Sequence, residues 1–89
     1  MKRSEILDTA KEYVTKDRAS QHGDAENNLN GIASGWDWWM SVRQEGEFSA
    51  MDVAVMMTIL KITRASSNPS NSDNFIDACG YMALAGEVA

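Results

Sequence analysis

The sequence has few of the residues that cross-link or interrupt a small fold. Its 89 residues include one cysteine, Cys79, and one proline, Pro69. A lone cysteine excludes an intramolecular disulfide bond and suits a reducing compartment. A chain of this length forms one domain with a thin core, so residues 1–89 are expected to make a single helical domain. Because no disulfide compensates for that core, we expect the chain to bury more apolar surface as a homo-oligomer.

Long apolar runs and an excess of basic residues are also missing. No apolar stretch reaches the roughly 20 residues needed to span a bilayer. The N-terminal "MKRSEILDTAKEY" lacks the continuous apolar segment of a signal peptide. The formal net charge is −5, and an acidic surface repels nucleic-acid backbones. We therefore expect a cytoplasmic protein that binds neither membranes nor DNA or RNA.

Helical periodicity is what the sequence does contain. Apolar residues recur at helical spacing in four segments. The segments are about 4–18, Asp24 to the loop "RQEGE", 49–65 and 72–87. Ser4 is the predicted N-cap of the first segment. The stretch "SAMD", residues 49–52, resembles a capping box. The third segment is apolar around almost its whole circumference, which is typical of a helix with neighbours on several sides. The sequence predicts an all-α fold, a small four-helix bundle that pairs with copies of itself.

Four charges flank the turn "ASSNPSNSD" between the last two predicted helices. If these helices form an antiparallel hairpin, Arg64 lies near Asp73. The same register places Lys61 near Asp77 or Ile76. One interpretation is therefore that two ion pairs close the base of a hairpin, where exposed pairs contribute only about 0–1 kcal/mol each.

A second interpretation is that some of these charges belong to a binding site. Lys61 lies in an otherwise apolar helix, where a half-buried cation is costly unless it has a partner or a function. Tyr81 lies one helical turn beyond Asp77 and adds a hydroxyl and an aromatic face. Lys61 and Arg64 would meet phosphate, Asp77 a ribose or base edge, and Tyr81 a stacked ring.

The loop "RASQHGD" offers a further contact for an anion. Arg18 and His22 flank a glycine turn that leads into a predicted helix N-terminus, where free amides favour negative charge. His22, Asp24 and Glu26 could also suggest a metal, but alternate positions in a loop are a poor metal signature. We expect no metal there and leave ligand contact open.

The second predicted helix carries three tryptophans and two glycines. Trp36 and Trp39 share a helical face, whereas Trp38 points away from them and marks an interface or a stacking surface. Packing within an oligomer is the favoured interpretation. Gly31 and Gly35 lie four residues apart, which permits another backbone to approach closely.

These motifs occur together in known proteins. The stretches "DR…HGD.ENNLNGIASGW", "MDVAVMMTILKITRASSNP" and "DNFIDACGYMALAGE" resemble a family of small, little-characterised helical proteins encoded by phages and prophages. The resemblance covers roughly residues 5–88 in the same order. The positions that match the family's pattern are Arg18, His22, Gly23, Trp36, Lys61, Arg64, Asp77, Gly80 and Tyr81.

Two analogies indicate different functions. Phage sponge proteins are small helical oligomers that sequester nucleotide immune signals, using cations for phosphate and aromatic rings for bases. MazG-type nucleotide pyrophosphatases are also small helical oligomers, but they hold Mg²⁺ on paired acidic motifs. Here Asp73 and Asp77 are the corresponding candidate ligands, although their spacing differs from the MazG pattern.

The residues fit sequestration better than hydrolysis, because the distinctive charges are cations. We therefore expect a phage-type anti-defence protein of an infected or lysogenic host that binds a nucleotide-like ligand, with no cofactor and no catalytic residue. The alternatives are a Mg²⁺-dependent pyrophosphatase and a non-catalytic helical protein that serves a structural or partner-binding role. The assigned ligand-binding residues are Arg18, His22, Lys61, Arg64, Asp77 and Tyr81, with Trp36 and Trp38 as stacking or interface residues.

Overall fold

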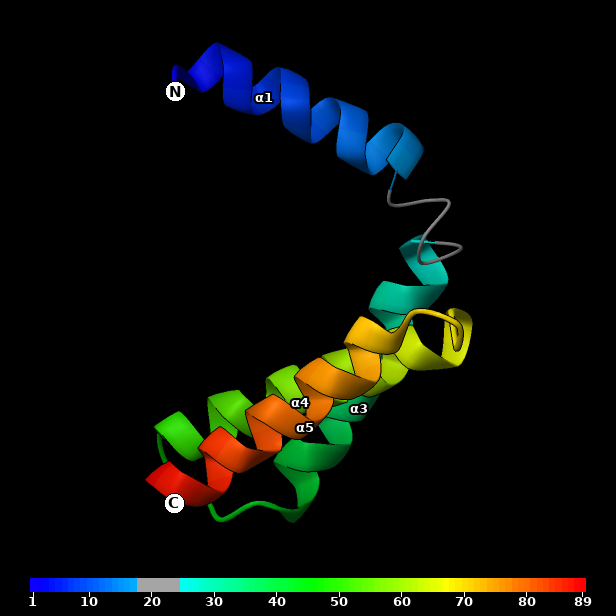
Figure 1. Cartoon of the computed structure of the whole chain (residues 1–89). Coiled ribbons are helices and arrows are strands. Elements are labelled where there is room, and N and C mark those ends of the chain that lie inside the picture. The colour runs from blue at the N-terminus through cyan, green and yellow to red at the C-terminus, as the bar shows by residue number, and fades with distance from the viewer. Residues whose placement is uncertain (18–24) are drawn as a thin grey trace.

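A computed structural model describes residues 1–17 and 25–89 of the chain, which contain helices and no strand (Figure 1). Helix α1 spans Arg3–Glu12 and continues into a π-helical turn, η1, at Tyr13–Asp17. The remaining helices are α3, Ala25–Val42, α4, Ala50–Ser67, and α5, Ser72–Val88. The predicted all-α fold with four α-helices is confirmed for this part of the chain. The single-domain and oligomer expectations stay predictions.

The starts of the helices follow local capping chemistry. At α4 the capping box is confirmed, because the Ser49 hydroxyl accepts from the Asp52 backbone N–H at 3.1 Å and the Asp52 carboxylate accepts from the Ser49 N–H at 2.9 Å. At α5 the Asn71 side chain accepts from the Asp73 N–H at 3.1 Å. Helix α1 begins one residue before Ser4 and has no side-chain cap, so the predicted Ser4 cap is wrong.

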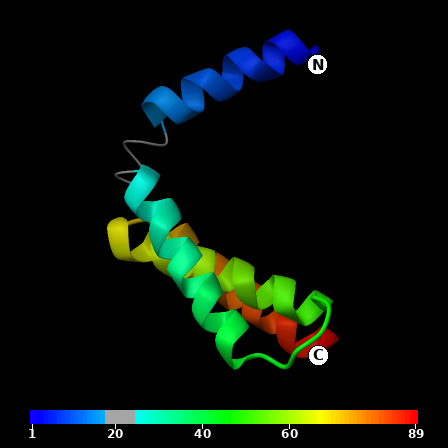
Figure 2. The same cartoon turned by 180° about the vertical axis from the view of Figure 1, so that it is seen from behind.

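Helices α3 and α4 approach each other closely through the two glycines of α3. A Cβ added at Gly31 would lie 2.9 Å from Cγ2 of Thr63, and one added at Gly35 would collide with Cγ2 of Ile59. Both contacts follow an antiparallel register, which Figure 2 shows from behind. The predicted close approach is therefore present, and a side chain at Gly35 would force these helices apart.

Helix α4 is central to the packed unit, as its all-round apolar surface predicts. It packs against α3 on one side and against α5 on the other. The α4–α5 hairpin turns at 68–71 and brings Lys61 of α4 to Asp77 of α5. The predicted antiparallel hairpin and its register are therefore confirmed.

The hydrophobic core of one copy is small. In the described part of the chain, the buried apolar residues are Ile32, Ala54 and Ala85. The accessible surface is 6548 Å² for a 9.8 kDa chain, whereas a folded monomer of this mass exposes about 5,200 Å². An isolated copy therefore leaves much of its apolar surface in water.

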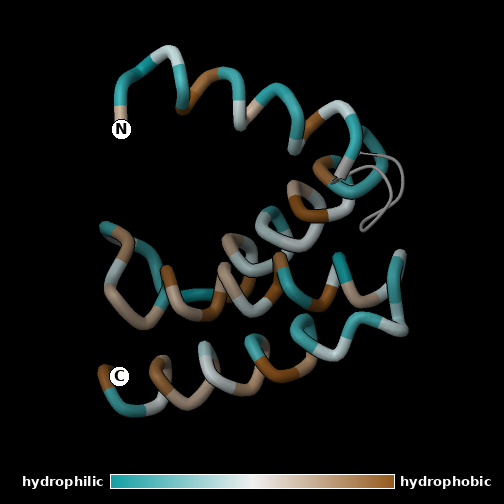
Figure 3. The backbone as a smooth tube through the Cα atoms, turned by 45° about the horizontal axis from the view of Figure 1, so that its top comes forward, coloured by the Kyte–Doolittle hydropathy of each residue, from teal (hydrophilic) through white to brown (hydrophobic). Residues whose placement is uncertain are grey.

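Helix α1 stands apart from the packed helices α3, α4 and α5 in both views (Figures 1 and 2). None of its residues is buried. Figure 3 shows hydrophobic and hydrophilic residues alternating along it. Within the described ranges, no helix has the length and hydropathy needed to cross a membrane.

Candidate functional site

The candidate site lies on the α4–α5 hairpin, at the ion pair between Lys61 and Asp77. The Lys61 Nζ lies 3.0 Å from Oδ2 of Asp77, and the two side chains are 17% and 44% exposed. The cation is thus largely withdrawn from water, while the carboxylate keeps an open side. An ammonium has three N–H donors, and within the described chain Asp77 is the one ion-pair partner of Lys61.

Helical spacing places two further groups beside this pair. Arg64 follows Lys61 by three residues on α4, and Tyr81 follows Asp77 by four residues on α5. Both side chains are half-buried. The site therefore combines two cations, one carboxylate and one phenol on facing turns of two helices.

Two buried asparagines occupy the same end of the packed unit. Asn28 of α3 is 9% exposed and Asn74 of α5 is 2% exposed. The Asn28 Oδ1 accepts from the Ser67 hydroxyl at 2.9 Å, whereas Nδ2 of Asn74 has no hydrogen-bond partner. A buried, unpaired amide donor costs about 1–3 kcal/mol. Asn74 precedes Asp77 by three residues, so this donor lies on the face of α5 that carries the ion pair.

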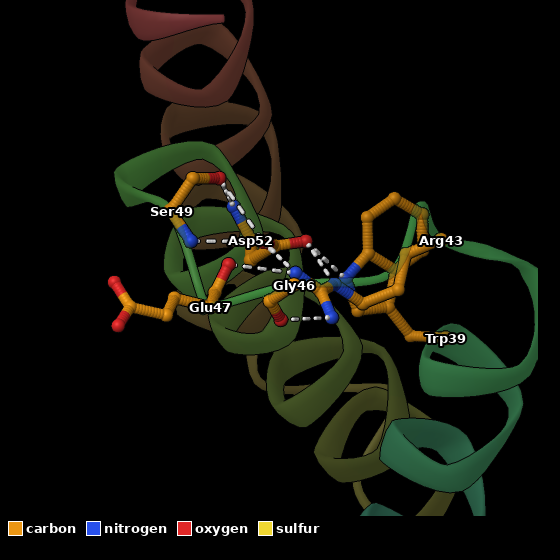
Figure 4. A network of polar contacts seen from close by, with 6 residues as sticks. All are labelled: Trp39, Arg43, Gly46, Glu47, Ser49 and Asp52. Carbon is orange, nitrogen blue, oxygen red and sulfur yellow. Dashed lines mark hydrogen bonds and ion pairs between the residues drawn. The ribbon is translucent and has the colours of Figure 1, made fainter.

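A second cation–carboxylate pair lies at the opposite end of α4 (Figure 4). Asp52 accepts from Nε of Arg43 at 2.9 Å and from its Nη2 at 2.8 Å. The indole of Trp39 and the backbone N–H and hydroxyl of Ser49 also donate to this carboxylate, at 3.0, 2.9 and 3.0 Å. The side chains of Arg43 and Asp52 are only 12% and 4% exposed. We call these four residues the Asp52 network.

The Asp52 network fixes the loop between α3 and α4. Arg43 also donates to the carbonyls of Gly46 and Glu47, at 3.2 and 3.0 Å, and stacks over the Phe48 ring at 4.8 Å. Gly46 has a φ of 120°, a backbone conformation that favours glycine. The hydrogen bonds from Arg43, and then those from Ser49 and Trp39, hold the pKa of Asp52 far below its usual range. This carboxylate has no free lone pair for a ligand, so its role is structural.

An apolar groove of about 470 Å³ lies across the three packed helices. Its wall includes Trp38 of α3, Val55 and Ile62 of α4 and Met82 of α5. Trp38, Ile62 and Met82 are 60%, 59% and 50% exposed. The groove extends toward the C-terminal end of α5, so it is separate from the polar end of the hairpin.

The predicted ion pairs of the hairpin have different outcomes. The pairing of Lys61 with Asp77 is present. The pairing of Arg64 with Asp73 is wrong, because it is not among the ion pairs between described residues. The reason is local, since the N-terminal turn of α5 directs Asp73 to solvent, where it is exposed.

Of the other predicted site residues, Trp36 and Trp38 contact other parts of the described chain. Arg18 and His22 lie outside the described residues. Trp36 is half-buried and donates from Nε1 to the Met56 carbonyl at 2.8 Å, so it joins α3 to α4. Trp38 lines the apolar groove instead. Trp36 and Trp39 both donate to α4, which agrees with their predicted shared face. The predicted separation of Trp38 from both is only partly right, because its ring centroid lies 6.5 Å from that of Trp39 and both line the groove. Contact of Trp36 or Trp38 with a ligand stays a prediction.

The alternative metal site at Asp73 and Asp77 has no supporting cluster of ligands. Among residues 1–17 and 25–89, no group of three or more histidine, cysteine or acidic side chains could hold a metal ion. Asp77 instead faces the ammonium of Lys61.

A family model confirms the resemblance to a group of related proteins. It matches residues 5–89 and describes a domain of unknown function, DUF6378. The chain belongs to the DUF6378 family. Every residue of the hairpin site and of the Asp52 network lies within the DUF6378 match.

Two curated relatives of this chain are phage proteins. The Gene 55 protein of Mycobacterium phage L5 is 41% identical over 79 residues, covering 89% of this chain and 49% of the relative. The Gene 55 protein of Mycobacterium phage D29 is 30% identical over 76 residues, covering 85% and 48%. The chain thus spans about half the length of these relatives, and it is a small phage-type protein. No solved structure matches this DUF6378 chain.

Proposed function

We propose that this protein binds a small nucleotide-like, phosphate-bearing ligand at the α4–α5 hairpin and retains it without converting it. The observation that carries the proposal is Lys61, whose side chain is 17% exposed and pairs with a half-exposed Asp77. A largely buried ammonium with unused donors is costly in an apolar helix. A phosphate that replaced water at those donors would offset that cost.

Each neighbouring group has a role in this proposal. Arg64 adds a second cation one helical turn from Lys61, and Asp77 orients the ammonium or accepts from a ribose hydroxyl. The Tyr81 ring borders the base.

Two parts of the proposal extend it beyond the hairpin. Arg18 and His22 would supply further contacts from the segment that precedes α3. Both curated relatives are phage proteins, so a linear or cyclic nucleotide signal of host immunity is the proposed class of sequestered ligand. The pyrophosphatase alternative has less support, because Asp77 contacts a cation.

The test is a binding screen with the full chain and a panel of linear and cyclic nucleotides. Differential scanning fluorimetry would find the ligand, and calorimetry would measure its Kd. Lys61→Met removes the ammonium and keeps an apolar stem. Lys16→Met is the matched control, because Lys16 forms an exposed ion pair with Glu12 at 3.1 Å. We expect Lys61→Met to weaken binding at least about tenfold, or about 1.4 kcal/mol, and Lys16→Met to leave the Kd unchanged.

The fate of the ligand separates sequestration from hydrolysis. A nucleotide recovered intact after the complex is denatured supports the proposal. Breakdown that requires Mg²⁺ would replace it with the pyrophosphatase alternative. If no nucleotide raises the Tm, or if Lys61→Met binds as tightly as the wild type, the proposed ligand site is wrong.

A further inference from the structure

The apolar groove across α3, α4 and α5 is a surface that the chain leaves uncovered. Its wall is almost entirely apolar, and it extends along α4 from Met51 to Ile62, a distance of about 17 Å at the helical rise. A groove of this length matches one amphipathic helix laid along it.

Helix α1 with η1 has the complementary surface. Its apolar residues recur at helical spacing, and Leu7 and Val14 are 67% and 64% exposed, while Ile6 and Tyr13 are each 51% exposed. The stripe from Ile6 to Val14 is about 12 Å long, so it fits within the groove. A helix this short is marginal in water without a partner for its apolar face.

The two parts also differ in charge, because residues 1–17 have a net charge of zero. Residues 1–17 contain four basic and four acidic side chains, whereas residues 25–89 contain three basic and eight acidic side chains, a net charge of −5. Asp37 precedes the groove residue Trp38, and Glu87 follows Gly86, which also lines the groove. Neither acid belongs to an ion pair within the described chain. Lys11 on α1 is exposed and could pair with either acid.

We infer that α1 is an arm that packs into the apolar groove of a second copy of this chain, and that two copies exchange their arms reciprocally. The contact is isologous, because each copy gives one helix and receives one. This inference is independent of the proposed ligand. It gives the groove and α1 a shared role that the hairpin site does not use.

Two observations favour a second copy over the chain's own arm. Helix α1 stands away from its own α3–α5 unit (Figures 1 and 2). The chain exposes 6548 Å², roughly 1,300 Å² more than a folded monomer of its mass. A standard interface buries about 800 Å² on each partner, so the excess is enough for a stable dimer.

The first experiment measures the mass of the full chain and its variants in solution by light scattering. We expect a wild-type dimer. Leu7→Glu on the arm and Met82→Glu in the groove should each raise the dimer dissociation constant at least about tenfold, because each buries a charge. Asp8→Lys on the polar face of α1 is the control, because the residues one helical turn from Asp8 are all polar, and this variant should remain a dimer. A monomeric wild type, or a dimer unaffected by Leu7→Glu, would overturn the inference.

Mixing the two variants separates arm exchange from packing within one chain. Leu7→Glu keeps an intact groove and Met82→Glu keeps an intact arm, so a mixed dimer regains one correct contact. We expect the mixture to dimerise more strongly than either variant alone. If α1 packs on its own chain, mixing restores nothing.

A cross-link keeps the inference testable if the charged variants unfold. Cys79 is free and exposed, so each chain first carries Cys79→Ser. One chain then carries Leu7→Cys and the other Met82→Cys. Oxidation of the mixture should give a disulfide-linked heterodimer. Monomers after oxidation, or a disulfide that forms equally with Asp8→Cys, would contradict arm exchange.

Discussion

Arg43–Asp52 and Lys61–Asp77 are both cation–carboxylate pairs that join helices, but their surroundings differ. Asp52 accepts hydrogen bonds from Arg43, Trp39 and Ser49, and its side chain is 4% exposed. Among the described residues Asp77 has one ion-pair partner, Lys61, and its side chain is 44% exposed. The first pair is closed to any ligand, whereas the second keeps an open carboxylate and unused donors.

This difference indicates how to separate structural charges from candidate binding charges. A buried carboxylate whose lone pairs are all used stabilises the fold and adds nothing to recognition. An ion pair whose hydrogen-bonding groups are only partly used contributes little stability. Its presence in the protein is easier to explain by a role in ligand binding. Substitution should therefore affect the stability of the two pairs to different extents, with the largest loss at Asp52 and the smallest at Lys61.

Asp52→Ala should lower the Tm more than Ser49→Ala does, and by several times the effect of Lys61→Met. The change leaves the buried guanidinium of Arg43 and the indole of Trp39 without their acceptor and frees the α3–α4 loop. Thermal and urea denaturation measure the loss. Equal Tm values for Asp52→Ala and Lys61→Met would remove the distinction between the two pairs.

Low pH should weaken the Arg43–Asp52 pair. The pKa of Asp52 is depressed in the folded state by Arg43, Ser49 and Trp39. Its stabilisation is therefore complete above the unfolded pKa of about 3.9 and is lost as the pH falls toward the lower folded pKa. We expect the wild-type Tm to fall below about pH 4, and Asp52→Asn to flatten that fall. Parallel Tm profiles for the two proteins would contradict the assignment.

Ser49→Ala should cost about 1 kcal/mol of unfolding free energy, because it removes the cap of α4. It also removes one donor to Asp52 while leaving the bidentate contact with Arg43 in place. The effect should therefore be smaller than that of Asp52→Ala. Chemical denaturation compares them, and an equal loss would mean that the cap, rather than Arg43, dominates the network.

Lys61→Met should change the unfolding free energy by less than about 1 kcal/mol, because the methionine side chain fills the same apolar space and the lost ion pair is half open. The same variant should lose binding of the nucleotide-like ligand. Denaturation and calorimetry on one preparation measure both effects. A large loss of stability would make Lys61–Asp77 a structural pair like Arg43–Asp52.

The helices and the hairpin register could be predicted from the sequence, because they depend on periodicity and on one short turn. The antiparallel register of the hairpin is enough to predict that Lys61 pairs with Asp77. The capping box at Ser49 and Asp52 is equally local. These features can be predicted without knowing how segments far apart in the sequence pack together.

The Asp52 network and the buried asparagines were missed by sequence reasoning, because they depend on how the chain folds in space. Arg43 reaches Asp52 only because the loop reverses at Gly46, and Trp39 adds its indole from the facing helix. A basic residue just before the loop, followed by the acid of a capping box, was the available signal. Asn74 reads as solvated in the sequence, yet it is 2% exposed.

The three tryptophans give the protein an internal set of optical probes. Trp36 donates to a backbone carbonyl, Trp39 donates to the Asp52 carboxylate, and Trp38 is 60% exposed at the groove. Iodide in solution should therefore quench Trp38 first, and a helix that fills the groove should protect it and shift its emission to the blue. The fluorescence of unlabelled protein would then follow occupation of the groove and integrity of the fold separately.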